Sequence, residues 1–164
     1  MTQALPPEAA GMVFRRCRSP WERRAVRELL AGRGIPQAEG DVAGTDLFGL
    51  WDLTAPAGEA LVAAAATGPL GDGGEVQLRG IAAAAGAGHR GLDRRLVCEV
   101  ADSLRARGAA RLMARRADGA GLTLALLRSA GFVPAGGGHA RAQVSAPRIG
   151  VPGDGEVSWW ELEL

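Results

Sequence analysis

The segment that most constrains the fold of this 164-residue chain runs from residue 80 to residue 108. It opens with the apolar run GIAAAA, continues as GAGHRGLD, and ends in RRLVCEVADSLRARG. Apolar residues then recur at helical spacing, at Leu96, Val97, Val100 and Leu104. We therefore expect a strand, a glycine loop, and a helix that begins at Asp93 and ends at Gly108, an arrangement that presents helix amides to a phosphate.

One interpretation of the glycine loop is a dinucleotide-binding fingerprint. Gly86, Gly88 and Gly91 spell GxGxxG after the strand and before the helix. A doubly wound sheet needs further alternating strand and helix units, whereas the remaining sequence indicates one more helix and then hairpin-like strands. The order of elements therefore argues against this interpretation.

The rest of the chain predicts one domain of mixed strands and helices. A helix over 19–34 has Ser19 as its cap and Pro20 in its first turn, and a short irregular or helical link follows over 35–44. A second helix is expected over 118–131. Strands are predicted over 12–18, 46–53, 59–70, 75–85, 110–116 and 156–164, with a further strand region starting at Phe132. Residues 1–164 then form a single domain whose first 11 residues are a loose tail.

This order resembles the GNAT family of acyl-CoA-dependent N-acyltransferases over residues 12–164. The best local matches are LRGIAAAAGAGHRGLDRRLVCEVADSLRARGAARLMA, with a degenerate coenzyme A motif, and LALLRSAGF at 124–132. The resemblance implies an α/β (α+β) fold: a mixed, mostly antiparallel sheet flanked by helices, in the order β-α-(α)-β-β-β-α-β-α-β-β. It also implies transfer of an acyl group from acetyl-CoA or another acyl-CoA to an amine of a small molecule or peptide, by direct attack in a ternary complex.

The resemblance further implies a coenzyme A site. The strand would pair with the pantetheine arm, and amides of the loop and helix start would hold the pyrophosphate. The residues concerned are Ile81, Ala82, Ala83, Gly88, His89, Arg90, Gly91, Leu92, Asp93 and Arg94. Gly91 and Leu92 fit the family motif, whereas Gly88 replaces a glutamine or arginine and Asp93 replaces a small residue. A carboxylate at Asp93 would compete for the same amides and repel a phosphate.

Candidate catalytic residues also come from the resemblance. Glu75 is the first candidate for the general base, and Gln77 occupies the position where the family commonly has a glutamate. The family's tyrosine position is Leu127, so Ser129 or a water would have to serve as the acid that protonates the leaving thiolate.

The tryptophans are divided between substrate binding and the core. Trp51 and Trp159 are candidates for the acceptor pocket. Adjacent strand residues face opposite sides of a sheet, so either Trp159 or Trp160 should face the core. Trp21 and Cys98 are expected to pack in the core.

Composition excludes several function classes. All 19 basic residues are arginine, so neither a P-loop nor a lysine Schiff base can form. The net charge of +1 argues against a globally basic nucleic-acid binder, and neither a metal-ligand cluster nor a membrane-spanning run is evident. We therefore expect a cytoplasmic protein without a metal.

Two alternative functions remain open, together with the oligomeric state. The chain could have lost coenzyme A binding and act as a module that binds a ligand or partner. It could also take its acyl group from a charged tRNA, through the arginines between residues 90 and 116. A homodimer through edge pairing of the terminal strand is a further expectation.

Overall fold

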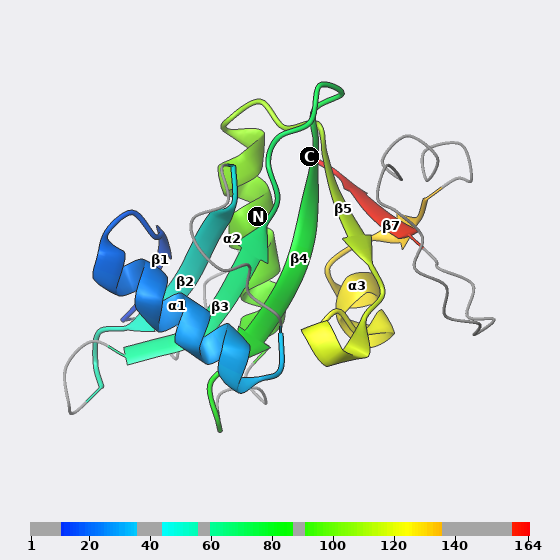
Figure 1. Ribbon diagram of the computed structural model, residues 1–164. Coiled ribbons are helices and arrows are strands. Elements are labelled where there is room, and N and C mark those ends of the chain that lie inside the picture. The colour runs from blue at the N-terminus through cyan, green and yellow to red at the C-terminus, as the bar shows by residue number, and fades with distance from the viewer. Residues whose placement is uncertain (1–10, 36–43, 56–59, 87–90, 136–158) are drawn as a thin grey trace, which may run out of the picture.

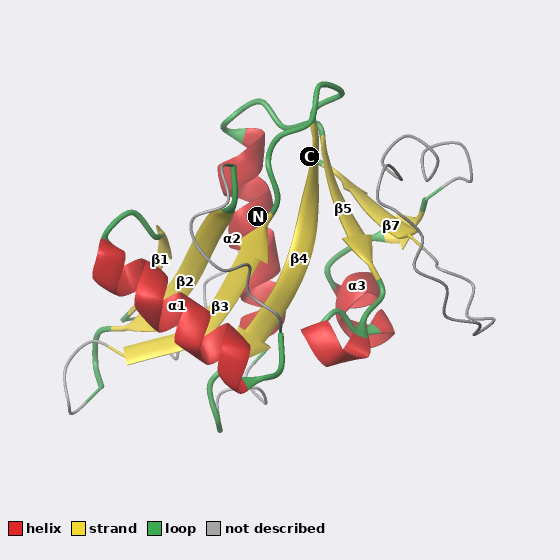
Figure 2. Ribbon diagram, viewed as in Figure 1, coloured by secondary structure: helices red, strands yellow, loops and turns green. Residues whose placement is uncertain are grey.

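A computed structural model describes residues 11–35, 44–55, 60–86, 91–135 and 159–164. Within them, seven strands form one sheet in the order β1-β2-β3-β4-β5-β7-β6, with helices on both faces (Figures 1 and 2). The strands are β1 (Met12–Arg16), β2 (Asp46–Asp52), β3 (Ala60–Thr67), β4 (Glu75–Ala83), β5 (Arg111–Arg115), β6 (Val133–Pro134) and β7 (Trp159–Glu163). The helices are α1 (Pro20–Gly32), α2 (Leu92–Arg105), the 3₁₀ turn η3 (Asp118–Ala120) and α3 (Leu124–Ser129).

The strand pairing confirms the mixed, mostly antiparallel sheet. Strands β1 to β4 pair antiparallel in sequence order, and β7 pairs antiparallel with both β5 and β6. Among the described strands, only β4 and β5 pair parallel. A doubly wound dinucleotide-binding sheet is mostly parallel, so this topology excludes that interpretation of the glycine loop.

Helices α1 and α2 lie on opposite faces of the sheet (Figure 1). The start of α1 is fixed by a capping box in which the Ser19 side chain accepts from the Glu22 amide and Glu22 accepts from the Ser19 amide. Residues Ala63 to Ala66 of β3 are all buried, and their alternating side chains contribute to the cores on both faces. Their small size lets both helices approach the sheet closely.

The second predicted helix is shorter than expected. Instead of a helix over 118–131, a 3₁₀ turn at Asp118–Ala120 precedes a helix that starts after Thr123, whose hydroxyl accepts from the Leu126 amide at 3.2 Å. Gly121 has a φ of +73°, which interrupts a continuous helix. The link over 36–43 and most of the strand region after Phe132 lie outside the described residues.

Two side chains expected in the core are exposed. Trp21 lies in the first turn of α1 and is 53% exposed, although its ring makes an edge-to-face contact with the Trp51 ring at a centroid distance of 5.2 Å. Cys98 is exposed because it lies four residues after Arg94 and four before Asp102, on the charged face of α2.

Candidate functional site

Strand β4 separates from β5 halfway along its length. The two strands pair only from Glu75↔Arg111 to Leu78↔Ala114, and β4 then continues to Ala83. Against β3, the register jumps by one residue because Ala66 pairs with Gly80 while Thr67 pairs with Leu78. The extra residue, Arg79, is a β-bulge, which bends a strand at the point where the pairing ends. Figure 1 shows β5 diverging from β4 beyond this point.

The connection from β5 to α3 fills part of the space between the two diverging strands. Gly121, in the connection from β5 to α3, approaches β4 so closely that a Cβ on it would lie 2.0 Å from the carbonyl oxygen of Ile81. Ile81 and Ala82 are buried, and Ala83 is half-buried. A pantetheine arm pairing with this edge would therefore meet Ala82 and Ala83 first, and would reach Ile81 only if Gly121 moved.

The N-terminus of α2 follows β4 and presents amides with one carboxylate among them. Gly91 is the N-cap, with a φ of 63°, so the helix begins at Leu92, one residue earlier than predicted, and Asp93 lies inside its first turn. The Asp93 carboxylate accepts from the Arg94 amide at 2.7 Å. The amides of Leu92 and Asp93 have no acceptor among the described residues. The predicted Gly88, His89 and Arg90 lie outside the described residues.

The candidate bases lie on the sheet face opposite α2. Glu75 forms an ion pair with Arg111 across the β4–β5 pair, at 3.1 Å. Gln77 lies two residues further along β4 on the same face. Gln77 lies opposite Met113 of β5, and Met113 lies opposite Glu161 of β7, so these three residues form one cross-strand row of the sheet.

Glu161 is a carboxylate that the sequence prediction missed. Its Oε2 atom is buried and has no hydrogen-bond partner in the described part of the chain. The alternation in WWELEL was the available signal, because Trp160 is buried in the core, which places Trp159 and Glu161 together on the other face.

Helix α3 provides no readily available proton donor for the leaving thiolate among its described side chains. Leu127, at the family's tyrosine position, is 1% exposed and packs in the core. The Ser129 hydroxyl donates to the Leu126 carbonyl at 2.9 Å, one turn back in the same helix. Ser129 would have to break this bond to donate to a thiolate.

The structure does not bring the two candidate acceptor tryptophans together. Trp51 is 2% exposed on β2 and packs against Trp21, with the guanidinium of Arg15 6.0 Å from its ring centroid. Trp159 is half-buried on β7, which is separated from β2 by three strands. As expected, its neighbour Trp160 faces the core.

Within the described residues, no three histidine, cysteine or acidic side chains gather as they would around a metal ion. None of the described helices is long and apolar enough to span a membrane.

Among known proteins, this chain matches solved structures by its fold. No family model matches the sequence, and no curated protein matches it. A putative acetyltransferase of the GNAT family from Desulfovibrio desulfuricans superposes with a TM-score of 0.67 at 20% identity, covering 93% of this chain and 98% of that one. The chain has the GNAT fold.

Two further solved structures share the fold. The ribosomal-protein-S18-alanine N-acetyltransferase of Escherichia coli has a TM-score of 0.60 at 22% identity, with 93% of each chain covered. The spermidine N-acetyltransferase of Vibrio cholerae, solved with CoA and spermine, has a TM-score of 0.64 at 12% identity, covering 94% of this chain and 96% of that one. The fold predicted from the order of elements is thereby confirmed.

Proposed function

We propose that this GNAT-fold protein transfers an acyl group from acetyl-CoA or another acyl-CoA to an amine. The observation that carries the proposal is the continuity of β4 with α2. The strand leaves β5 after Leu78, and α2, which follows it in the chain, opens with the amides of Leu92 and Asp93, which have no acceptor among the described residues. An open strand edge can pair with the amides of a pantetheine arm. A helix N-terminus attracts the pyrophosphate at the other end of the same molecule.

Transfer would proceed by direct attack of the amine on the thioester. The strand amides of the β4 edge would polarise the carbonyl, and holding both reactants there supplies the orientation. Expulsion of a thiolate does not require a bound acid, so the loss of tyrosine at Leu127 and the occupied hydroxyl of Ser129 slow the step without preventing it.

The proton of the attacking amine needs a base, and the candidates lie on the sheet face opposite α2. The Glu75 carboxylate is held by Arg111, and Gln77 can orient a water but cannot take a proton. Glu161 has a carboxylate oxygen without a partner among the described residues, in the same row as Gln77. We therefore add Glu161 to Glu75 as a candidate base.

The acceptor is proposed only as an amine of a small molecule or peptide. Structural neighbours are named for acceptors as different as spermidine and an alanine of a ribosomal protein. Trp159 and Glu161, side by side on β7, suit a cationic group, because an aromatic face and a carboxylate both attract an ammonium ion.

One observation favours the alternative, a binding module that has lost coenzyme A. The Asp93 carboxylate accepts a hydrogen bond from the Arg94 amide and places a negative charge where a pyrophosphate would bind. At about 4–6 Å and an effective dielectric near 20, such a repulsion costs up to roughly 3–4 kcal/mol.

Calorimetry with acetyl-CoA and free CoA tests the proposal, followed by CoA release in the presence of a panel of amines. Micromolar binding and amine-dependent release support the transferase. A folded sample that binds no CoA ester supports the binding module. Salt-sensitive binding of charged tRNA, with none of CoA, supports the third hypothesis, a tRNA-borne donor.

A further inference from the structure

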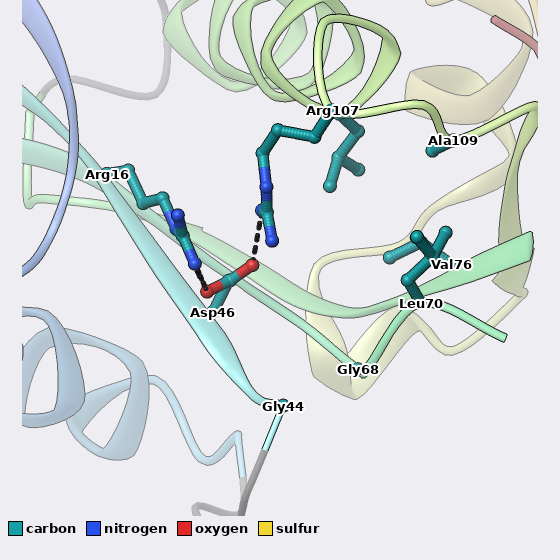
Figure 3. A pocket seen from close by; sticks show the side chains of 9 residues that line it. Arg16, Gly44, Asp46, Gly68, Leu70, Val76, Arg107 and Ala109 are labelled. Atoms are coloured by element: carbon teal, nitrogen blue, oxygen red, sulfur yellow. Dashed lines mark hydrogen bonds and ion pairs between the residues drawn. The ribbon is translucent and has the colours of Figure 1, made fainter. Parts of the chain in front are cut away.

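A pocket lies at the opposite end of α2 from the candidate coenzyme A site. It occupies about 100 Å³ and is lined by Arg16, Gly44, Asp46, Gly68, Leu70, Val76, Leu104, Arg107 and Ala109 (Figure 3). These residues come from the ends of β1 and α2 and the starts of β2 and β4, together with the turns beside them. The 14 residues of α2 separate the pocket from the helix N-terminus by roughly 20 Å.

On one side of the pocket, the described residues carry more positive than negative charge. The Oδ1 atom of Asp46 accepts from Nε and Nη2 of Arg16, at 3.0 and 2.7 Å, and Oδ2 accepts from Nη1 of Arg107 at 2.5 Å. Burial alone would raise the pKa of Asp46, but the hydrogen bonds from Arg107 and Arg16 outweigh it and hold that pKa below its ordinary value. Among the described residues, the charged lining is therefore two guanidinium ions and one carboxylate, and each guanidinium has N–H donors that Asp46 does not use.

The other side of the pocket is apolar. Val76 and Leu104 are each 2% exposed and form its wall, and Leu70 is 50% exposed at its edge. An apolar group bound in this space would cover the exposed surface of Leu70. Removing that apolar surface from water is favourable, so it would stabilise the bound state. Figure 3 shows the arginines and Asp46 gathered at one side, with Leu70 and Val76 at the other.

A buried hydroxyl lies next to the charged side. Thr67 is fully buried, and its Oγ1 atom has no hydrogen-bond partner in the described part of the chain. It sits directly opposite Asp46 in the β2–β3 register, and Gly68, the next residue, lines the pocket. Thr67 does not itself line the pocket, so its hydroxyl lies behind the lining and is not a contact for a ligand.

We propose that this pocket binds a small monocarboxylate with a short apolar tail. The carboxylate of the ligand accepts hydrogen bonds from the N–H groups of Arg107 and Arg16 that Asp46 does not use. Guanidinium groups suit this geometry, and the negative charge of the ligand balances the charge of the lining. The tail lies against Leu70, Val76 and Leu104. The volume admits a group of only a few heavy atoms, so butyrate is a fitting probe and a long acyl chain is not.

Titration of the whole protein with butyrate, followed by amide NMR shifts, tests the proposal without reference to acyl transfer. We expect saturable shifts at Gly68, Leu70 and Ala109, with a Kd near or below about 1 mM. Acetate should bind at least threefold more weakly, and butyramide, which has the same shape without the charge, should cause no shifts there. Phosphate that binds as well as butyrate, or an absence of saturable shifts at these residues, would overturn the proposal.

Two variants test the two sides of the pocket separately. Arg107→Gln should weaken butyrate binding at least fivefold, whereas Arg105→Gln, which removes the arginine that pairs with Asp102 at the same end of α2, should leave it unchanged. Leu70→Ser should weaken the binding of butyrate more than that of acetate. Equal effects of the two arginine substitutions, or equal losses for both ligands in Leu70→Ser, would contradict the assigned contacts.

Discussion

Gly121 touches the carbonyl of Ile81 where β4 has left β5, and no other residue type fits there. An added Cβ would lie 2.0 Å from that oxygen, and the glycine φ of +73° is itself unfavourable for a side chain. This contact keeps the connection from β5 to α3 close against the open edge of β4. It therefore determines how much of that edge remains for a ligand.

Replacement of Gly121 by alanine should lower the free energy of unfolding by about 1–3 kcal/mol, because it adds backbone strain and a clash with main chain. Urea denaturation measures the loss. Gly119→Ala is the matched control, since a Cβ there meets nothing within 4 Å. If the two variants were equally stable, the close contact between Gly121 and Ile81 would not exist in solution.

Removal of the Asp93 charge should strengthen coenzyme A binding at least tenfold. Asp93→Asn keeps an oxygen that can accept from the Arg94 amide, so the helix start is preserved while the repulsion of the pyrophosphate is removed. Calorimetry with CoA measures the change. Asp102→Asn, which neutralises an exposed carboxylate near the other end of α2, should leave the affinity unaltered, and equal gains in both variants would show a general charge effect instead.

The two candidate bases can be separated by kinetics. Glu161→Gln should lower kcat by about 10²-fold or more if Glu161 takes the amine proton, with KM for acyl-CoA little changed. Glu75→Gln should have a smaller effect on kcat, since Glu75 is paired with Arg111. Glu163→Gln changes an exposed glutamate two residues further along β7 and is the control. A full loss in Glu75→Gln with none in Glu161→Gln would restore Glu75 as the base.

Much of this fold was predictable because its signals are local. The change from alternating to helical spacing between residues 80 and 108 needs no knowledge of distant residues, and neither does the capping box at Ser19. The length of α3 was predicted wrongly because the effect of Gly121 depends on its contact with β4. The sequence also gave no reason to associate Arg16, Asp46 and Arg107, which are 30 and 61 residues apart and meet only through the sheet register and the end of α2.

The two cysteines should differ strongly in reactivity. Burial, followed by the nearby charge of Glu22, raises the pKa of Cys17 to about 12, so almost no thiolate exists at neutral pH. Cys98 is exposed, although partial burial of the thiol also raises its pKa. A disulfide reagent at pH 8 should therefore modify one thiol per native chain and two after unfolding. Cys98→Ser should abolish the native reaction, and rapid labelling of Cys17 would contradict the described burial.

The Asp46 ion pairs should make stability depend on pH in a defined direction. Because Arg107 and Arg16 hold the pKa of Asp46 below its unfolded value near 3.9, their contribution is present above about pH 4 and is lost as the pH falls through the lower folded pKa. Asp46→Asn should therefore be less stable than the natural chain at pH 6, and the difference should shrink towards pH 3 in urea denaturation. Asp72→Asn, at an exposed turn between β3 and β4, is the control for the loss of one negative charge from the chain. A gap for Asp46→Asn that stayed constant from pH 6 to pH 3 would mean that the arginines do not favour the ionised carboxylate.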